Sequence, residues 1–187
     1  SPGDTNSTGL GEYFFDGGAD DFVVGLGATG PCDKSGQIAD VRINAGAFMH
    51  ELGHTLGLDH GGATDPDQFK PNYYSVMNYT WAIPRPWAPP NGWRLDYAHK
   101  PGLDPRFINL IERALTESDG LVSGPGPILT VPYSDKNYKM RQARAEYGVG
   151  VDWNGDGQVT GLIDLVDVNE PTHGTTDCAG ILDTHMS

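Results

Sequence analysis

The stretch of sequence that decides the fold runs from residue 48 to residue 60 and reads FMHELGHTLGLDH. His50 and His54 are four residues apart, so on an α-helix they lie on one face, one turn above each other. Two imidazoles in that arrangement can share one zinc ion. Glu51 follows the first histidine, and its carboxylate can therefore reach a metal-bound water rather than the metal. The pattern predicts a helix over about residues 45–56, with Asn44 as its N-cap.

Gly57 and His60 extend the pattern beyond this helix. A helix that continued past residue 56 would carry His60 to a different face. Gly57 can adopt the left-handed conformation that ends a helix, so the chain turns back and His60 arrives as a third ligand. Three protein ligands with one open position are typical of catalytic zinc, whereas structural zinc takes four, usually with thiolates. We therefore favour a catalytic zinc site over a helix that carries incidental histidines.

A second segment, Ser75-Val76-Met77-Asn78-Tyr79, follows this pattern. HExxHxxGxxH with a later methionine turn resembles the metzincin metalloproteases. The resemblance implies that Met77 lies beneath the zinc site as an apolar floor. It also implies that Tyr79, two residues after the methionine as in astacin-like and serralysin-like members, approaches the zinc and stabilises the transition state. Ordinary packing in the core is the alternative for both side chains.

The resemblance implies an α+β fold built on a metzincin-like catalytic domain. We expect three parts: an upper catalytic subdomain with the zinc-binding helix over residues 1–60, a lower subdomain with the methionine turn and a C-terminal helix over residues 61–147, and an acidic tail over residues 148–187. Only 49 residues precede His50, so we expect the domain to lack part of the usual N-terminal sheet. Gly (26) and Pro (14) are abundant, so we expect a loop-rich C-terminal subdomain. The subfamily stays open, because Gly61 stands where metzincins carry Glu, Pro, Ser or Asp.

Hydrophobic periodicity and turn residues predict further elements outside the helix that carries His50. Strands are expected over residues 21–28 and 128–133. Asp104 and Pro105 are an N-cap and a first-turn residue, which predicts a helix that runs to about residue 118. A weaker helix is expected over residues 136–147.

Together these residues predict a zinc-dependent endopeptidase, a hydrolase that acts on peptide bonds. In this interpretation zinc activates a water molecule, Glu51 is the general base, and Tyr79 helps to hold the oxyanion. A protein or peptide substrate would dock on an exposed sheet edge, either residues 21–28 or residues 38–43. The alternative is a non-catalytic, calcium-dependent binding module of a secreted protein with an idle zinc site.

The composition narrows the choice of partners. Twelve Lys and Arg against 25 Asp and Glu give a formal net charge of −13, which repels phosphate backbones and disfavours nucleic acid as a partner. No run of 18 apolar residues is present, so no membrane-spanning helix is expected. An acidic chain with few lysines, and with Trp and Tyr, suits a secreted, extracellular protein, which we expect to be a monomer.

Much of the acidic surplus lies near the C-terminus, where no Lys or Arg occurs from residue 145 onward. The run Asp152-Trp-Asn154-Gly-Asp156-Gly-Gln158 fits the front half of an EF-hand-like calcium loop, with oxygen ligands at alternate positions and glycine at the sixth. The twelfth position is Ile163, and Asp164 comes one residue late. The sequence therefore predicts either a variant calcium loop with a shifted carboxylate or a solvated turn rich in Asp and Gly.

The two cysteines, Cys32 and Cys178, fit neither a CxxC pair nor a multi-thiolate metal site. They are either two buried thiols or one disulfide. A disulfide that closes so long a loop would stabilise the fold by about 4–5 kcal/mol in the chain-entropy model.

Overall fold

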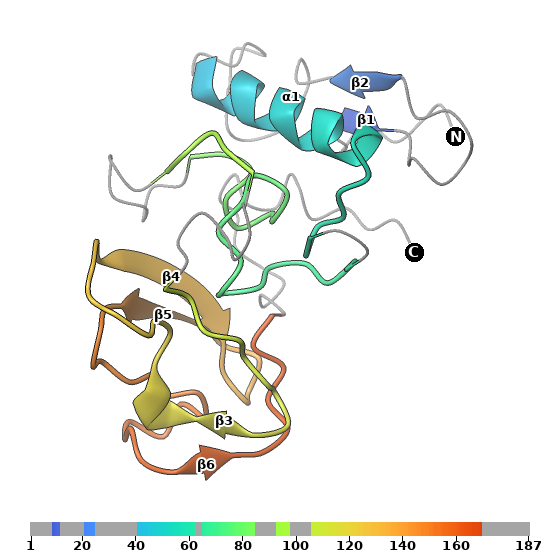
Figure 1. Cartoon of the computed structure of the whole chain (residues 1–187). Coiled ribbons are helices and arrows are strands. Elements are labelled where there is room, and N and C mark those ends of the chain that lie inside the picture. The colour runs from blue at the N-terminus through green and yellow to red at the C-terminus, as the bar shows by residue number, and fades with distance from the viewer. Residues whose placement is uncertain are drawn as a thin grey trace, which may run out of the picture.

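The computed structural model describes residues 9–11, 21–24, 41–62, 65–84, 93–97 and 106–169. Figure 1 shows an upper part and a lower part, with residues 56–84 running between them. The upper part holds helix α1 (Val41–Thr55) and strands β1 (Gly9–Gly11) and β2 (Phe22–Val24). The lower part holds strands β3 (Leu115–Thr116), β4 (Leu129–Ser134), β5 (Met140–Ala145) and β6 (Leu162–Ile163).

The upper part packs α1 against a short antiparallel pair of strands. In this pair Leu10 of β1 lies opposite Val23 of β2, and both strands contact the helix. The rings of Phe22 and Phe48 meet edge to face with centroids 5.1 Å apart. Of the strand expected over residues 21–28, residues 22–24 are confirmed and residues 25–28 lie outside the described ranges. Within those ranges, no helix is both long and apolar enough to cross a membrane.

Helix α1 begins earlier than the sequence predicts. It starts at Val41, so Asn44 lies inside the helix and its predicted role as N-cap is wrong. The β-branched residues Val41 and Ile43 suggested an extended approach to the helix. Their helix propensity is only about 0.5 kcal/mol poorer than that of alanine, which is too weak a preference to keep these residues out of a helix.

The end of α1 follows the prediction. Gly57 has a φ of 81°, the left-handed conformation expected of it. Its N–H donates to the carbonyl of His54 at 2.9 Å, and the N–H of Leu58 donates to the carbonyl of Gly53 at 2.9 Å. This pair of bonds is the Schellman arrangement, which satisfies the last helical carbonyls while it turns the chain.

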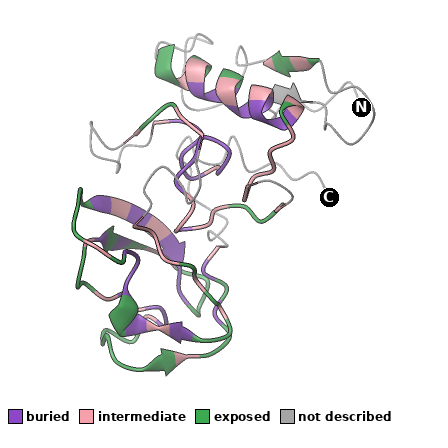
Figure 2. Ribbon diagram, in the orientation of Figure 1, coloured by how far each residue is buried: buried purple, intermediate pink, exposed green. Residues whose placement is uncertain are grey.

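Small residues on α1 let the segment of residues 76–82 approach the helix closely. A Cβ atom on Gly46 would stand 2.1 Å from the backbone oxygen of Ala82, so only glycine fits there. Ala47 beside it is also buried. Figure 2 shows the buried side of α1 turned toward this largely buried segment. At Gly46 the helix is therefore held against this segment by close approach of the two backbones.

The lower part is built from two antiparallel pairs of strands. β4 and β5 form a hairpin in which Leu129 pairs with Ala145 and Ser134 with Met140, and this confirms the strand expected over residues 128–133. β3 pairs with β6, with Leu115 opposite Ile163.

The predictions of a helix that runs to about residue 118 and of a helix over residues 136–147 are both wrong within the described residues. Residues 106–114 form turns and loop, and they lead into β3 and a 3₁₀ helix over Glu117–Asp119. Ile111 is 59% exposed, and the backbone on either side of it bonds to distant segments: the N–H of Ile108 donates to the carbonyl of Leu121, and the carbonyl of Glu112 accepts from Val166. The segment expected as a helix over residues 136–147 contains β5, where Ala143 and Ala145 are buried and Gln142 and Arg144 are exposed. This alternation of two small alanines was too weak a signal to predict a strand.

One hydrophobic core serves the lower part. It includes Val131 of β4, Ala145 of β5, and Trp153 and Val166 from beyond the boundary expected at residue 147. Tyr74 and Trp81, from the segment that runs under α1, belong to the same core. The described part of the acidic tail, residues 148–169, thus packs together with the hairpin, and the core reaches up to the segment beneath the histidines.

Candidate metal centre

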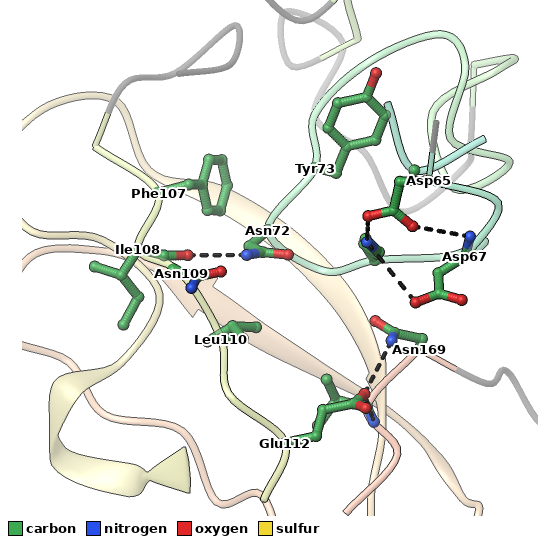
Figure 3. Close-up of a pocket in the computed structure, with 13 residues that line it drawn as sticks. Asp65, Asp67, Asn72, Tyr73, Phe107, Ile108, Asn109, Leu110, Glu112 and Asn169 are labelled. Atoms are coloured by element: carbon green, nitrogen blue, oxygen red, sulfur yellow. Dashed lines mark hydrogen bonds and ion pairs between the residues drawn. The ribbon is translucent and has the colours of Figure 1, made fainter. Parts of the chain in front are cut away.

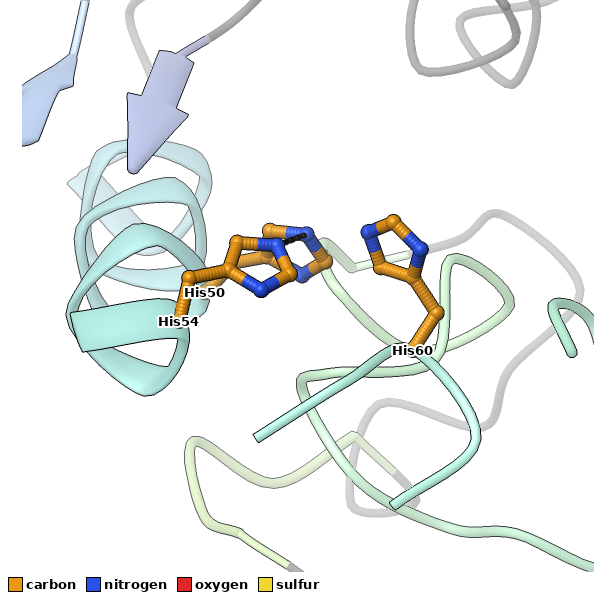
Figure 4. A group of neighbouring side chains, drawn as sticks. All are labelled: His50, His54 and His60. Atoms are coloured by element: carbon orange, nitrogen blue, oxygen red, sulfur yellow. Dashed lines mark hydrogen bonds between the residues drawn. The ribbon is translucent and has the colours of Figure 1, made fainter. Parts of the chain in front are cut away.

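The three histidines of the HExxHxxGxxH pattern come together in space, as the sequence predicts. His50 and His54 project from α1 and His60 from the turn that follows it (Figure 4). One ligand atom from each lies within 4.8 Å of the others, and among the described residues this is the group of His, Cys, Asp and Glu side chains that could hold a metal ion.

A tight turn presents His60. The N–H of Asp59 donates to the carbonyl of Gly62 at 2.9 Å, and the reverse bond measures 3.1 Å. His60 and Gly61 therefore lie at the tip. A Cβ atom on Gly61 would come within 2.7 Å of both the side chain of Asp65 and the backbone oxygen of Asp67. This crowding explains why glycine follows the third histidine in this chain.

Hydrogen bonds fix the tautomer of the two helical histidines. His50 Nδ1 lies 2.8 Å from the carbonyl oxygen of Val76, and His54 Nδ1 lies 2.9 Å from that of Leu58. Because a carbonyl oxygen only accepts, both Nδ1 atoms carry the proton. Both Nε2 atoms are therefore lone-pair donors, and they stand 3.2 Å apart. A cation is what stabilises two lone pairs at that distance, and such backbone bonds are typical of metal-ligating histidines.

His60 contributes a third lone pair. Its Nε2 is buried and has no hydrogen-bond partner among the described residues. Its Nδ1 lies 3.4 Å from the side-chain nitrogen of Gln68. If the Gln68 amide is rotated by half a turn, its oxygen takes the place of the nitrogen and accepts a hydrogen bond from Nδ1–H of His60. With the proton on Nδ1, the Nε2 atom of His60 is available to a metal ion.

Burial keeps the three imidazoles neutral. It lowers the pKa of His50 to about 4, with a smaller contribution from the neighbouring His54. It lowers the pKa of His60 to about 3, helped by His50 and His54. The pKa of His54 is also lowered, mainly by burial. Neutral imidazole is the form that binds metal ions, so the site is ready for one at neutral pH.

Glu51 and Tyr79 lie beside the histidines. Glu51 is 6% exposed and follows His50 on the buried side of α1. The ring of Tyr79 stacks on His50 with centroids 5.2 Å apart and lies tilted against His60 at 4.4 Å. The structure thus brings the ring of Tyr79 to two of the predicted ligands and buries Glu51 beside the first of them on the helix.

Met77 lies directly against the helix between the ligands. It is fully buried, and a Cβ atom on Gly53 would stand 2.1 Å from its sulfur. Gly53 lies between His50 and His54 in the sequence and directly precedes His54. Met77 therefore packs against the helix beneath these two histidines. This is the position that the methionine-turn resemblance implies, and it is also a core position.

The side chain of Asn78 holds the turn that carries Met77, a role that the sequence does not predict. Its amide nitrogen donates to the carbonyls of Lys70 and Tyr73, both at 2.7 Å. Its oxygen accepts from the N–H of Thr80 at 3.1 Å. The residue is fully buried. Asparagine is common in turns, but nothing in its spacing shows that one side chain satisfies three backbone groups.

The remaining predicted ligands lie elsewhere. Asp152, Asn154, Asp156 and Gln158 form a loop in the lower part, and Asp164 is exposed beyond it. Asp152 Oδ1 accepts from the N–H groups of Gly155 and Asp156, and Oδ2 accepts from Gly157. Cys32 and Cys178 lie outside the described residues.

A cavity of about 440 Å³ lies where the segment after His60 meets the lower part (Figure 3). Its charged groups already have partners. Lys70 forms an ion pair with Asp65. Glu112 Oε1 accepts from the N–H of Val168 at 3.0 Å and from the Asn169 amide at 2.9 Å. Burial raises the pKa of Glu112, with Asp167 and Asp67 adding to it. The segment after His60 is joined to the lower part by the side-chain amide of Asn72, which donates to the carbonyl of Ile108 at 2.9 Å.

The sequence matches no protein-family model, and neither curated proteins nor solved structures show a significant match. The assignment of the site therefore rests on the geometry of the histidines and their neighbours.

Proposed function

We propose that this chain is a zinc-dependent endopeptidase of the metzincin kind. The observation that carries the proposal is the convergence of three imidazoles, with one ligand atom from each within 4.8 Å of the others, as in the open three-ligand set that catalytic zinc prefers. Zinc held by His50, His54 and His60 would supply Lewis-acid polarisation of a water molecule and of the scissile carbonyl. The acidic, Trp-bearing composition supports a secreted monomer.

Glu51 would carry the proton. Its carboxylate accepts a proton from the attacking water, whose oxygen forms the new bond to the carbonyl carbon. When the C–N bond breaks, Glu51 returns that proton to the leaving nitrogen. Burial supports this role, because it shields the carboxylate from bulk water.

Tyr79 would stabilise the oxyanion. Its ring lies on His50 and His60, so its phenol belongs to the same site. A phenol can donate a hydrogen bond to the negative charge that develops on the carbonyl oxygen.

The substrate would be an extended peptide that adds a strand to the upper sheet. Of the two edges that the sequence offered, residues 41–43 belong to α1. This leaves β2, where Val23 is 67% exposed. We therefore place the docking edge at β2.

Hydrolysis of casein by the zinc-loaded protein tests the proposal. We expect cleavage that a zinc chelator abolishes and that added zinc restores. Glu51→Gln should keep one zinc per chain and lose nearly all activity, because the base is gone and the ligands remain. Glu112→Gln, a glutamate remote from the histidines, serves as the matched control and should retain activity. A zinc-loaded protein that cleaves nothing, or a Glu51→Gln variant with full turnover, contradicts the proposal, and the first result favours the calcium-dependent binding module.

A further inference from the structure

The backbone of Phe69 adopts a conformation that a bulky residue rarely takes. Its φ is 59°, which lies in the left-handed region. A Cβ atom crowds the backbone there, so the conformation costs free energy for a residue with a large side chain. Tyr138 and Leu165 are the other described residues besides glycine with a positive φ, and both side chains are exposed. Phe69 differs from these two because it is half-buried.

The ring of Phe69 packs on the ring of Tyr79. Their centroids are 5.5 Å apart and their planes meet at 52°, within the range of favourable aromatic pairs. Tyr79 in turn stacks on His50 with an interplanar angle of 20° and lies tilted at 38° against His60. Phe69 therefore adds a third ring contact to Tyr79, from outside the group of three histidines.

The residues on either side of Phe69 are fixed by contacts of their own. Gln68, before it, places its side-chain amide 3.4 Å from Nδ1 of His60. Lys70, after it, accepts through its carbonyl oxygen from the side-chain amide of Asn78 at 2.7 Å. The left-handed residue is thus held between a contact to the third histidine and a contact to the turn beneath the histidines. Strained backbone persists only where its surroundings determine it, and such residues cluster at functional sites.

The ring is what this residue supplies at a cost. Glycine would adopt the same backbone conformation without strain. It would leave the ring of Tyr79 without the contact to Phe69. A hydrogen-bond donor is most effective in catalysis when it is already oriented before the reaction, because no reorganisation is then needed in the transition state. Rotation about the side-chain bonds of Tyr79 would turn its hydroxyl away, and packing on Phe69 opposes that rotation.

We propose that Phe69 is a positioning residue that holds the ring of Tyr79 on His50 and His60, so that the phenol acts from a fixed orientation. The inference rests on the function proposed above for Tyr79, which is to donate to the oxyanion. Phe69 acts through Tyr79 on the transition state. Its loss should therefore change kcat rather than KM.

Kinetics of Phe69→Gly in the zinc-loaded protein test this role. The change removes the ring and the backbone strain together. It should lower kcat about 10-fold with KM unchanged, because a donor that is free to turn stabilises the transition state less. Phe69→Leu, which keeps the apolar bulk without the aromatic ring, should lower kcat in the same direction, and it replaces Phe69→Gly if that variant does not fold.

Tyr138→Gly is the matched control. It makes the same exchange at an exposed aromatic residue whose φ is 55°. The backbone strain is relieved as in Phe69→Gly, but no ring contact to Tyr79 is lost. Its kcat should equal that of the parent.

A double-variant cycle with Tyr79→Phe separates positioning from a general loosening of the site. Tyr79→Phe lacks the hydroxyl, so adding Phe69→Gly should lower kcat no further, because there is no donor left to orient. A purely structural effect of Phe69→Gly on the metal ligands would lower kcat by the same factor in both backgrounds.

Proton NMR of the Tyr79 ring measures the same contact without catalysis. The parent for this experiment is the zinc-loaded Glu51→Gln protein, which avoids autolysis, and the spectrum of Tyr79→Phe assigns the resonances. Ring currents of His50 and His60 should displace the Tyr79 resonances from their ordinary positions. Phe69→Gly should move them back toward those positions, and Tyr138→Gly should not. If the chain proves to have no peptidase activity, the proposed function fails and this measurement still decides whether Phe69 holds Tyr79.

Two results overturn the inference. The first is a Phe69→Gly protein whose Tyr79 resonances and kcat match those of the parent. The second is an equal loss of kcat from Phe69→Gly with and without the hydroxyl of Tyr79.

Discussion

The histidine site and the loop of residues 152–163 both start from short sequence motifs, and the fold completes them differently. The histidines lie within eleven consecutive residues, and a helix followed by a glycine turn is enough to bring them together. The loop carries a motif of alternating acidic and amide side chains, but the buried Glu117, which accepts from the N–H of Thr160 in this loop, reaches it through the pairing of β3 with β6. A site can thus be predicted from a sequence motif when the local structure of one short segment is enough to bring its residues together.

Removing one histidine should have the largest effect. His60→Ala should weaken zinc binding by about 100-fold or more, because one of three ligands of a strongly bound ion is lost. Asp156→Asn in the lower loop should leave zinc affinity unchanged. Competition with a chromogenic chelator measures both. An equal loss of zinc affinity in the two variants would show that zinc binding does not depend on the histidines alone, and it would contradict the separation of the histidine site from the loop.

Gly46→Ala should destabilise the upper part strongly. The new Cβ atom meets the backbone oxygen of Ala82, which cannot move aside as a flexible side chain can. We expect a loss of about 2–4 kcal/mol in the free energy of unfolding, although alanine is the better helix former by about 1 kcal/mol.

Asn44→Ala on the exposed side of the same helix is the matched control. It should change stability by no more than about 0.5 kcal/mol. Chemical denaturation compares the two variants. If Gly46→Ala proves as stable as the parent, the close approach of residues 76–82 to α1 is wrong.

Replacing Asn78 should loosen the turn beneath the histidines. Asn78→Asp replaces the amide nitrogen, which donates to the carbonyls of Lys70 and Tyr73, by an oxygen that cannot donate to them. We expect a loss of about 2–3 kcal/mol in the free energy of unfolding. Asn72→Asp removes one such bond, to Ile108, and should cost about half as much. Denaturation midpoints measure both, and zinc affinity should fall only for Asn78→Asp.

Acid should destabilise the metal-free protein before its carboxylates titrate. The folded pKa values of His50 and His60, about 4 and about 3, lie below the ordinary 6.5, so the unfolded chain binds protons first as the pH falls. Stability is therefore full above pH 6.5 and declines toward the folded values, with a loss of about 2 kcal/mol per histidine by pH 5.

Zinc on the same nitrogens should raise the stability by a similar amount throughout that range and leave the decline in place, because the folded imidazoles are already neutral there and the protons are taken up by the unfolded chain. Unfolding experiments at a series of pH values, with and without zinc, provide the measurement. A metal-free protein whose stability does not change between pH 6.5 and pH 5 would contradict the burial of neutral imidazoles.

The sequence predicted the parts of the site that depend on local geometry. Helical spacing placed His50 and His54, and the freedom of Gly57 placed His60. It did not show Asn78, because a buried asparagine that binds three backbone groups looks like any turn residue. It did not show Glu117 either, because that contact needs the register of two distant strands.

The fold was predictable to the same extent. The end of α1 and the strand β4 follow from a glycine and from β-branched alternation. The helix expected after Asp104 failed because the pairing of Leu115 with Ile163 outweighs weak helical periodicity. The start of α1 was predicted wrongly because the preferences of Asn44 for a cap position and of Val41 for a strand are both weak, and neither excludes the residue from a helix.

X-ray absorption at the zinc edge tests the central claim most directly. The account predicts one zinc per chain with three imidazole nitrogens at about 2.0–2.1 Å and one further light-atom ligand. In His60→Ala, the spectrum should show two imidazole nitrogens in place of three, or the variant should retain no zinc and give no zinc spectrum. A spectrum with sulfur ligands, or a chain that retains no zinc after purification in its presence, would contradict it.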